Sequence, residues 1–374
     1  MTAKNKTTPW VRLGDYIEEC DERNLEGLPL PFYGINKKKT FMPTVADTNQ
    51  LDNSKYKVVG QGVFVFSGMQ TGRDQCIRLA LREDKNPVLI SPAYTTFRMK
   101  DESKLLPEYL FIFFKRKEMD RYGAFLSDGS IRSNLDWDRF CDIRIPLPSI
   151  EVQQELVNTY TGLQRLVEEN EALIAPLSKA CQAFIVDCQK KYPSVELGEY
   201  IEECDERNIE GRNYSFLGIN KAKTFMPTHA NTNELDNTKY KIVRKGIFAF
   251  SGMQTGRDIC IRIALYDKNK PALISPAYTT FRIKSPKLLS EYLFLQFKRS
   301  EMDRHGWYLS DSSVRSNLDW ERFNKIQVPL PPLEVQQSIV NLYHCIEEAK
   351  KIASEARAQL QTLCPALIQY AEHN

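Results

Sequence analysis

The chain is built from two consecutive copies of one sequence, and this duplication constrains its fold more than any other feature. LGDYIEECDERN at Leu13–Asn24 returns as LGEYIEECDERN at Leu197–Asn208, and SGMQTGRD at Ser67–Asp74 returns unchanged at Ser251–Asp258. The offset between the copies is 184 residues, and it falls to 183 after one residue is lost near Asp101–Lys104. Solenoid repeats span only about 20–50 residues, so the pattern predicts two copies of a whole domain.

The first part of each copy, about 140 residues long, combines short strands, turns and a helix. The runs YKVVGQGVFVFS and CIRLAL are rich in β-branched and aromatic residues, which predicts strands. SGMQTGRD lies between these two runs, so we expect it to be a hairpin loop. Residues Leu105–Gly123 have helical periodicity and are expected to end at the glycine. The prolines of IRIPLP and IQVPLP are expected to end the last strand.

The second part of each copy carries a heptad pattern of apolar residues. Steps of three and four continue over more than four heptads, which predicts a coiled coil of two helices, each roughly 50 Å long. Asn170 would favour one register at some cost in stability. Two amphipathic helices, each packed on its own domain, are the alternative. The predicted coiled-coil seam consists of Val152, Leu156, Thr159, Leu163, Leu166, Asn170, Leu173, Leu177, Ala180 and Phe184, and in the second copy of Val335, Ile339, Leu342, Ile346, Ala349, Ala353, Ala356, Leu360, Leu363 and Leu367.

Charge separates the two kinds of segment. The whole chain has a net charge of only +3, which by itself says nothing about nucleic acid. Residues 151–191 and 334–374 each carry a net charge of −2, so the remaining residues hold +7. This division suits globular parts that face phosphates and helices that face protein.

Composition excludes several classes of protein. The polar start MTAKNK is not followed by an apolar segment, and no run approaches the ~20 apolar residues that span a bilayer. Nine cysteines, with no CxxC pair, fit reduced thiols better than disulfides. We therefore expect a cytoplasmic protein without a membrane partner. The four histidines have no metal-ligand spacing, so no metal site is expected.

No familiar catalytic motif occurs in the sequence. It lacks the [ND]PP[YF] stretch of amino-methyltransferases, a phosphate-binding loop and a zinc-protease helix. The acidic stretch YIEECDERN leaves one enzymatic alternative, a nuclease site built on Glu18, Glu19 and Asp21. A charged, solvated helix turn is the other interpretation of this stretch.

One junction resembles a known family. SDGSIRSNLDWDRFCDIRIPLPSIEVQQELV and its copy SDSSVRSNLDWERFNKIQVPLPPLEVQQSIV resemble the end of a target recognition domain that runs into a conserved helix. Both halves of the chain add a starting VRLGDYIEE or VELGEYIEE and a central ISPAYTTF. Each motif is modest, but their order, spacing and duplication are similar to those of the DNA specificity (S) subunits of type I restriction-modification systems.

The resemblance implies an α+β fold with two mixed α/β recognition domains separated by two long antiparallel coiled-coil helices, as a pseudo-two-fold repeat. It implies a non-catalytic subunit that reads a bipartite site in double-stranded DNA and docks two methyltransferase (M) subunits and restriction (R) subunits. It implies no cofactor in this chain, with S-adenosylmethionine in the methyltransferase and ATP and Mg in the restriction subunit. The expected domains are 1–150 (first recognition domain), 151–190 (first helix), 191–333 (second recognition domain) and 334–374 (second helix).

Candidate DNA contacts follow from residue chemistry. Arginine suits guanine O6 and N7, and glutamine suits adenine N6 and N7. The candidate base-reading residues are Gln70, Arg73, Arg132, Gln254, Arg257 and Arg315, and the candidate phosphate contacts are Lys37, Lys38, Lys39, Lys221 and Lys223. The alternatives are a structural turn whose arginine pairs with Asp74 or Asp258, and a run of solvated lysines.

The repeat also predicts the form of the target. Like readers on antiparallel helices read the same sequence on opposite strands, so we expect an interrupted palindrome. Three pairs of patches differ between the copies: Leu28–Pro31 and Arg212–Ser215, Val45–Asp47 and His229–Asn231, Ala124–Phe125 and Trp307–Tyr308. A different class of protein, an adaptor or decoy that binds methyltransferase without reading DNA, is the remaining alternative.

Overall fold

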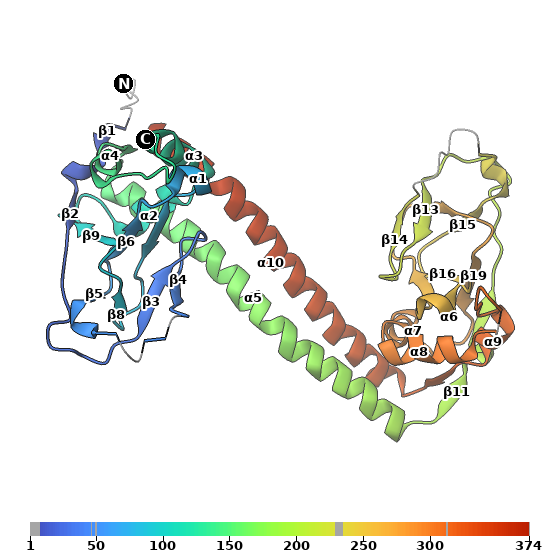
Figure 1. The fold of residues 1–374 in the computed structure, drawn as a ribbon. Helices are drawn as coiled ribbons and strands as arrows, with labels where there is room; N and C mark the ends of the chain where they lie inside the picture. The colour runs from blue at the N-terminus through green and yellow to red at the C-terminus, as the bar shows by residue number, and fades with distance from the viewer. Residues whose placement is uncertain (1–7, 46, 49–50, 229–234, 312, 374) are drawn as a thin grey trace. The chain divides into compact units, whose positions relative to one another are not determined.

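The structure is a computed structural model, and its two units are drawn in Figure 1. It describes residues 8–45, 47–48, 51–228, 235–311 and 313–373. Of residues 361–373 only the helical backbone is described. The chain divides into unit 1, residues 1–170 and 352–374, and unit 2, residues 171–351. Among the helices of the described residues, none is both long and apolar enough to cross a membrane.

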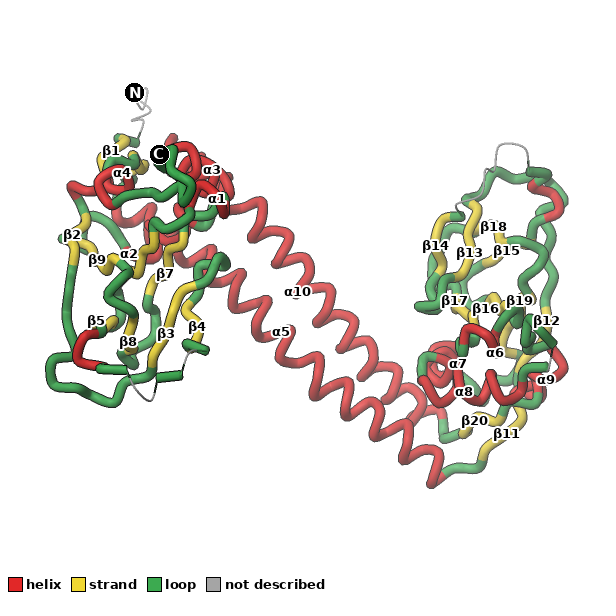
Figure 2. Tube along the Cα trace, in the orientation of Figure 1, coloured by secondary structure: helices red, strands yellow, loops and turns green. Residues whose placement is uncertain are grey.

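Among the described residues, the globular part of unit 1 contains two four-stranded sheets, a two-stranded pair and four short α-helices (Figure 2). The strand orders are β2-β9-β6-β7, β4-β3-β8-β5 and β1-β10. The strands are β1 (Trp10–Arg12), β2 (Ile17–Glu19), β3 (Phe32–Ile35), β4 (Phe41–Pro43), β5 (Lys57–Val59), β6 (Phe64–Ser67), β7 (Arg78–Leu81), β8 (Val88–Ile90), β9 (Thr95–Met99) and β10 (Arg144–Pro146). The helices are α1 (Thr71–Asp74), α2 (Pro107–Phe114), α3 (Lys117–Leu126) and α4 (Trp137–Cys141).

The globular part of unit 2 repeats this topology. Its strand orders, β12-β19-β16-β17, β14-β13-β18-β15 and β11-β20, match those of unit 1 strand by strand. The duplicated mixed α/β domain predicted from the repeat is therefore confirmed. The strands are β11 (Ser194–Glu196), β12 (Ile201–Glu203), β13 (Phe216–Ile219), β14 (Phe225–Pro227), β15 (Lys241–Val243), β16 (Phe248–Ser251), β17 (Arg262–Leu265), β18 (Ala272–Ile274), β19 (Thr279–Ile283) and β20 (Gln327–Pro329). The helices are α6 (Thr255–Asp258), α7 (Ser290–Phe297), α8 (Ser300–Leu309) and α9 (Trp320–Asn324).

Strand β6 shows how the sequence builds two cores in one unit. Phe64 and Phe66 enter the main core under α2 and α4, whereas Val65 enters a second core between the two sheets. Successive side chains of a strand point to opposite faces, so a sheet covered on both faces needs a continuous apolar run. The Phe64 ring stacks on Phe97 at 4.8 Å, and Phe66 stacks on Phe140 at 4.3 Å.

The helix predicted over Leu105–Gly123 is in fact two helices. Arg116 is extended, with φ −71° and ψ 140°, and separates α2 from α3. Gly123 lies inside α3 and does not end it. A Cβ atom at Gly123 would lie 2.4 Å from Cγ1 of Ile77, so the glycine lets α3 pack closely against the chain entering β7.

Two long helices, α5 (Ile150–Lys191) and α10 (Leu333–His373), contribute to both units. Each unit contains the first half of one helix and the last half of the other, the arrangement of an antiparallel pair. In unit 2, Ile185 of α5 and Ile346 of α10 are buried in one cluster. In unit 1, Leu360 of α10 packs on the core that contains Leu156 of α5. These shared clusters contradict the alternative of two helices that pack separately.

The predicted seam of α5 is displaced by one position at Thr159, Leu166, Leu173 and Phe184, whereas Val152 and Ala180 are half-buried. Leu166 and Leu173 are 43% and 49% exposed, and Phe184 is exposed as well, contrary to the prediction. The buried residues come one position later, at Val167 and Ile185. Leu156 is buried and Leu163, Asn170 and Leu177 are half-buried, while in α10 Ile339, Ile346, Ala349, Ala353 and Ala356 are buried and Leu342 and Leu360 half-buried.

The polar character of some seam residues explains the displacement. The inner series of α5 begins at Gln153 and continues through Tyr160, Val167 and Cys181, which a pattern of apolar residues does not reveal. The Gln153 side chain is fully buried: its oxygen accepts a hydrogen bond from the Leu106 N–H (2.9 Å), and its nitrogen donates to the Lys104 and Pro148 carbonyls. The side chains of Leu363 and Leu367 lie outside the described residues.

Candidate nucleic-acid interface

The SGMQTGRD stretch connects β6 to β7, which pair antiparallel, so the predicted hairpin is present. Its last four residues form the one-turn helix α1, and Gln70 before it has a φ of +58°. A Cβ atom on Gly68 would lie 1.7 Å from the carbonyl oxygen of Leu135, and one on Gly72 would lie 2.0 Å from the hydroxyl oxygen of Ser133. The two glycines therefore permit the close approach of a second loop.

That second loop, residues 128–136, is held in shape by its own hydrogen bonds and docks on the first. The Asp128 carboxylate accepts a hydrogen bond from the N–H of Asn134 (3.0 Å). The side-chain oxygen of Asn134 accepts one from the N–H of Gln70 (2.9 Å), and two backbone hydrogen bonds of 2.8 and 3.0 Å join the loops directly. We call residues 67–75 and 128–136 the paired loops of unit 1.

Unit 2 has the same paired loops, formed by residues 251–259 and by the described part of 311–319. The Asn317 side chain accepts a hydrogen bond from the N–H of Gln254 (2.9 Å), and the Asp311 carboxylate accepts one from the N–H of Asn317 (3.0 Å). Because two separately encoded segments reproduce these bonds, the docking follows from the shared residues themselves.

The paired loops present a glutamine–arginine pair to solvent. Nη2 of Arg73 donates a hydrogen bond to the side-chain oxygen of Gln70 (2.9 Å), and Arg257 does the same to Gln254 (2.6 Å). The Arg73 side chain is 62% exposed. The pair therefore presents an amide and a guanidinium side by side, which are the two groups that suit purine edges.

Asp74 is bound mainly by residues other than Arg73. Nζ of Lys37 lies 3.1 Å from its carboxylate and Arg78 also pairs with it, whereas Nε of Arg73 lies 3.9 Å away. The hydrogen bonds from Lys37 and from Arg78 hold the pKa of Asp74 below its ordinary value. In unit 2 the corresponding Arg257–Asp258 distance is 3.4 Å. The alternative of a structural turn therefore accounts for the role of Asp74, which binds Lys37 and Arg78. It does not account for Arg73, which is too far from Asp74 to be its main partner.

Arg132 and Arg315 extend from the second loop of each pair. Both side chains are exposed, and within the described residues neither forms a hydrogen bond or ion pair. Each directly precedes the serine whose carbonyl oxygen bonds the glycine of the first loop, Ser133 or Ser316. The fold thus brings the loops that carry Arg132 and Arg315 beside the hairpins that carry the Gln–Arg pairs, which are distant from them in the sequence.

Two of the predicted phosphate contacts are wrong. Lys39 and Lys223 are each only 5% exposed, and their ammonium groups lie 2.6 and 2.7 Å from the carboxylates of Asp120 and Asp303. The same Asp120 oxygen accepts the N–H of Ile77, so the lysine helps to hold the hairpin on α3. A buried ammonium paired in this way cannot reach DNA phosphate.

The other three lysines remain candidates. Lys38 is exposed, and the side chains of Lys37 and Lys221 are largely exposed although they pair with Asp74 and Asp258. Of the patches that differ between the copies, Ala46 and residues 229–234 lie outside the described part of the chain.

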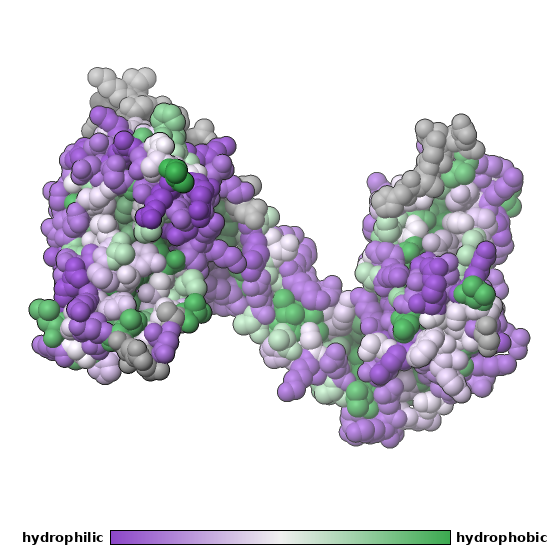
Figure 3. Space-filling model, viewed as in Figure 1, coloured by the Kyte–Doolittle hydropathy of each residue, from purple (hydrophilic) through white to green (hydrophobic). Residues whose placement is uncertain are grey.

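Sequence reasoning missed two exposed apolar side chains in the paired loops. Ile131 and Val314 are 98% and 99% exposed in the second loops. Phe125 and Tyr308, which belong to the patches that differ between the copies, are exposed near the ends of α3 and α8. An apolar residue inside the polar stretches DGSIRSN and SSVRSN was the available signal. Figure 3 shows a mainly hydrophilic face on each unit, with hydrophobic side chains scattered over it.

The acidic stretch is strand β2 and the turn after it, not a helix turn. Glu18 lies 2.9 Å from Arg98, and Asp21 lies 2.8 Å from Arg23 and 3.0 Å from Lys57. No group of three metal-ligating side chains occurs among the residues that the structure describes. These pairings oppose the nuclease alternative.

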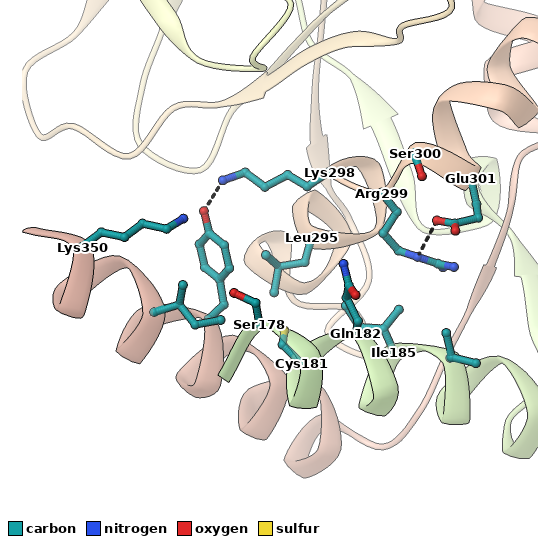
Figure 4. A pocket seen from close by; sticks show the side chains of 13 residues that line it. Ser178, Cys181, Gln182, Ile185, Leu295, Lys298, Arg299, Ser300, Glu301 and Lys350 are labelled. Atoms are coloured by element: carbon teal, nitrogen blue, oxygen red, sulfur yellow. Dashed lines mark hydrogen bonds and ion pairs between the residues drawn. The ribbon is translucent and has the colours of Figure 1, made fainter. Parts of the chain in front are cut away.

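A pocket of about 470 Å³ in unit 2 lies where α5, α7, α8 and α10 meet (Figure 4). Nζ of Lys298 is hydrogen-bonded to the Tyr343 hydroxyl and lies 4.5 Å from the centre of that ring. Burial lowers the pKa of Lys298. In unit 1 the ammonium of Lys115 lies 4.9 Å from the ring of Tyr160. The repeated lysine–tyrosine contact marks this region as the joint between a globular part and the helices.

Comparisons with known proteins agree with this architecture. The chain matches the putative type I restriction enzyme MjaX specificity subunit of Methanocaldococcus jannaschii at 21% identity over 85% of this chain and 79% of the relative. It matches the type I restriction enzyme MjaVIII specificity subunit of the same organism at 20% identity over 71% of this chain and 70% of the relative.

Among solved structures, a type I restriction-modification system S subunit from M. genitalium shares the fold. Its TM-score is 0.57 at 12% identity, covering 100% of this chain and 98% of that chain. Residues 4–177 and 202–361 match the type I restriction modification DNA specificity domain. Because the two matches together cover most of the sequence and fall on both copies, the chain belongs to the family of type I restriction-modification DNA specificity domains.

Proposed function

We propose that this specificity subunit reads two half-sites in double-stranded DNA, one with the paired loops of each unit. The observation that supports the proposal most directly is the repeated Gln–Arg pair, fixed by the same hydrogen bonds in both units and exposed to solvent. A glutamine amide and an arginine fork held side by side match the donor and acceptor edges of adenine and guanine in the major groove. Arg132 and Arg315 add a second guanidinium to each surface.

Phosphate contacts are assigned to the exposed lysines. Lys37, Lys38 and Lys221 lie on the hairpin turns near the paired loops, and phosphate contacts set register without carrying sequence information. Lys37 and Lys221 would exchange one carboxylate partner for a phosphate. Binding is then expected to weaken with salt, with a slope that falls by about 0.9 for each lost contact.

The helices are proposed to dock the catalytic partners. Leu166 in unit 1 and Leu173 in unit 2 are exposed apolar residues on α5. We propose that they contribute to the surface for two methyltransferase subunits, with restriction subunits joining that assembly. S-adenosylmethionine, ATP and Mg would then belong to the partners, and this chain would contribute recognition without catalysis.

The experiment is DNA binding by the complex with methyltransferase, using Arg73→Ala and Arg257→Ala singly and together. Each single change should weaken specific binding, since a good bidentate contact discriminates by about 1–3 kcal/mol. Arg165→Ala, an exposed arginine on α5, is the control for loss of charge. Loss of DNA binding in the double variant, with the complex intact, would discredit the adaptor alternative. An unchanged sequence preference would show that residues other than Arg73 and Arg257 read the bases.

The form of the site is tested by sequencing methylated DNA from cells that carry the system. Because the proposed readers are identical in both units, we expect two half-sites of the same sequence, arranged as an interrupted palindrome. Two unrelated half-sequences would refute this form. They would direct attention to the patches that differ between the copies, such as Ala124–Phe125 and Trp307–Tyr308.

A further inference from the structure

Ile131 and Val314 occupy equivalent positions in the second loops of the two units. Their exposed fractions of 98% and 99% mean that neither side chain packs against its own unit. Single exposed apolar residues are common on protein surfaces. Here, however, both copies retain a β-branched apolar residue at this position, although position 129 is glycine in one copy and the matching position 312 is serine in the other.

The loop that carries Ile131 is rigid for its size. The Asp128 carboxylate accepts hydrogen bonds from the N–H (3.1 Å) and the hydroxyl (2.6 Å) of Ser130, and from the N–H of Asn134. The N–H of Ser133 donates to the hydroxyl of Ser130 (3.1 Å), and Ser133 has a φ of +51°. The side chain of Ile131 therefore projects from a preformed turn, so little conformational entropy is lost when it meets a ligand.

We propose that Ile131 and Val314 each contact the 5-methyl group of a thymine in the half-site read by their unit. This inference rests on the proposed DNA-reading function. Arg132 and Arg315, the next residues, have no partner among the described residues and would reach the neighbouring base or phosphate. Apolar side chains read thymine by its methyl group in the major groove. A wedge between base steps is the less suitable role for the pair, because isoleucine is used as a wedge but valine, which occupies the same position in the second copy, is not among the usual wedge residues.

The test replaces thymine with deoxyuridine, one position at a time, in the target bound by the complex with methyltransferase. For the intact subunit we expect one thymine in each half-site whose replacement weakens binding about fourfold. This factor corresponds to the roughly 0.8 kcal/mol expected for burying one methyl group. Because the expected half-sites are alike and the subunit can bind them in either orientation, the variants are tested on a target replaced in both half-sites. On that target the intact subunit should lose about sixteenfold in binding, whereas Ile131→Ser and Val314→Ser, which each keep one methyl contact, should each lose only about fourfold.

The two variants are controls for each other, and neither change should alter the melting temperature because both side chains are exposed. The inference is refuted if every such thymine replacement is neutral for the intact subunit, if Ile131→Ser retains the full loss on the target replaced in both half-sites, or if a half-site contains no A·T pair. The loss of discrimination in Arg73→Ala and Arg257→Ala tests the reading function separately. If these variants lose discrimination while the thymine replacements are neutral for the intact subunit, the proposed DNA-reading function stands and only the methyl contact is rejected.

Discussion

Replacing Lys39 with methionine tests whether this lysine stabilises the fold or binds DNA. Methionine keeps most of the length and apolar character of the side chain but removes the ammonium group. The Asp120 carboxylate would then keep the N–H of Ile77 as its partner and lose the Lys39 hydrogen bond of 2.6 Å. An uncompensated charge would remain in a largely buried place.

The expected cost follows from the burial of the two groups. Breaking a buried ion pair by removing one partner costs about 3–5 kcal/mol. The lysine is 5% exposed but the aspartate is 21% exposed, so water can reach part of the carboxylate and the lower figure applies. We expect unit 1 to lose about 3 kcal/mol, which lowers its melting temperature by roughly 6–12 °C for a body of this size.

The assay is thermal unfolding of the full chain, combined with the salt dependence of DNA binding by its complex. Lys223→Met should produce a similar loss in unit 2, where Asp303 holds the matching lysine at 2.7 Å. Lys38→Met, at an exposed site, should change stability by less than about 0.5 kcal/mol. Adding Asp120→Asn to Lys39→Met should restore part of the stability, because the amide oxygen still accepts the Ile77 N–H. A normal melting temperature together with a lower salt slope in Lys39→Met would refute the reasoning.

Three further changes test other parts of the structure. Gly72→Ala should separate the paired loops and weaken DNA binding, at a cost of about 1–3 kcal/mol in unfolding experiments, because its Cβ would lie 2.0 Å from a serine hydroxyl; Gly129→Ala, with no atom within 4 Å, should be neutral. The lowered pKa of Asp74 means that its pairing stabilises the fold above about pH 4 and that this stabilisation is lost as the pH falls below that. Asp74→Asn should therefore flatten the acid side of a profile of stability against pH. An unchanged slope in that variant would contradict the assignment. Val167→Asp should disrupt the seam in unfolding measurements and Leu166→Asp should not, because the first side chain is buried and the second is exposed; equal effects would restore the predicted register.

The repeat was sufficient to predict the duplicated α+β fold, because matching segments with matching spacing fold alike. Lys39 could not be placed in the same way. A run of three lysines indicates a charged surface, and its third member is buried only because Lys39 has a φ of +61° and turns toward Asp120, which is 81 residues away in the chain. The seam of α5 shows the same limit, since a buried glutamine and a buried cysteine are invisible to an apolar pattern.

The sequence predicted which types of residue the candidate site contains, but not how they are arranged on the surface. Glycines at 68 and 72 indicated a turn, but only the structure shows that each admits the backbone or hydroxyl of another loop. The exposed position of Ile131 was equally inaccessible, because no pattern in a single polar loop tells whether its apolar residue packs inward. Long-range contacts decide both.

The pairing of β1 with β10 has a consequence for how such a protein can change. These strands are the first and last of the globular part of unit 1, and Trp10 lies opposite Pro146 in their ladder. The chain thus enters and leaves the globular part at neighbouring points, so the part between them can be exchanged for another while the long helix behind it stays continuous. Gln153 lies outside that segment and binds the backbone at Lys104 and Leu106 inside it. A graft would keep its attachment to the helix only if the donor offers the same backbone groups there. This requirement concerns the shape of the backbone, so the residues that we propose to face DNA could vary.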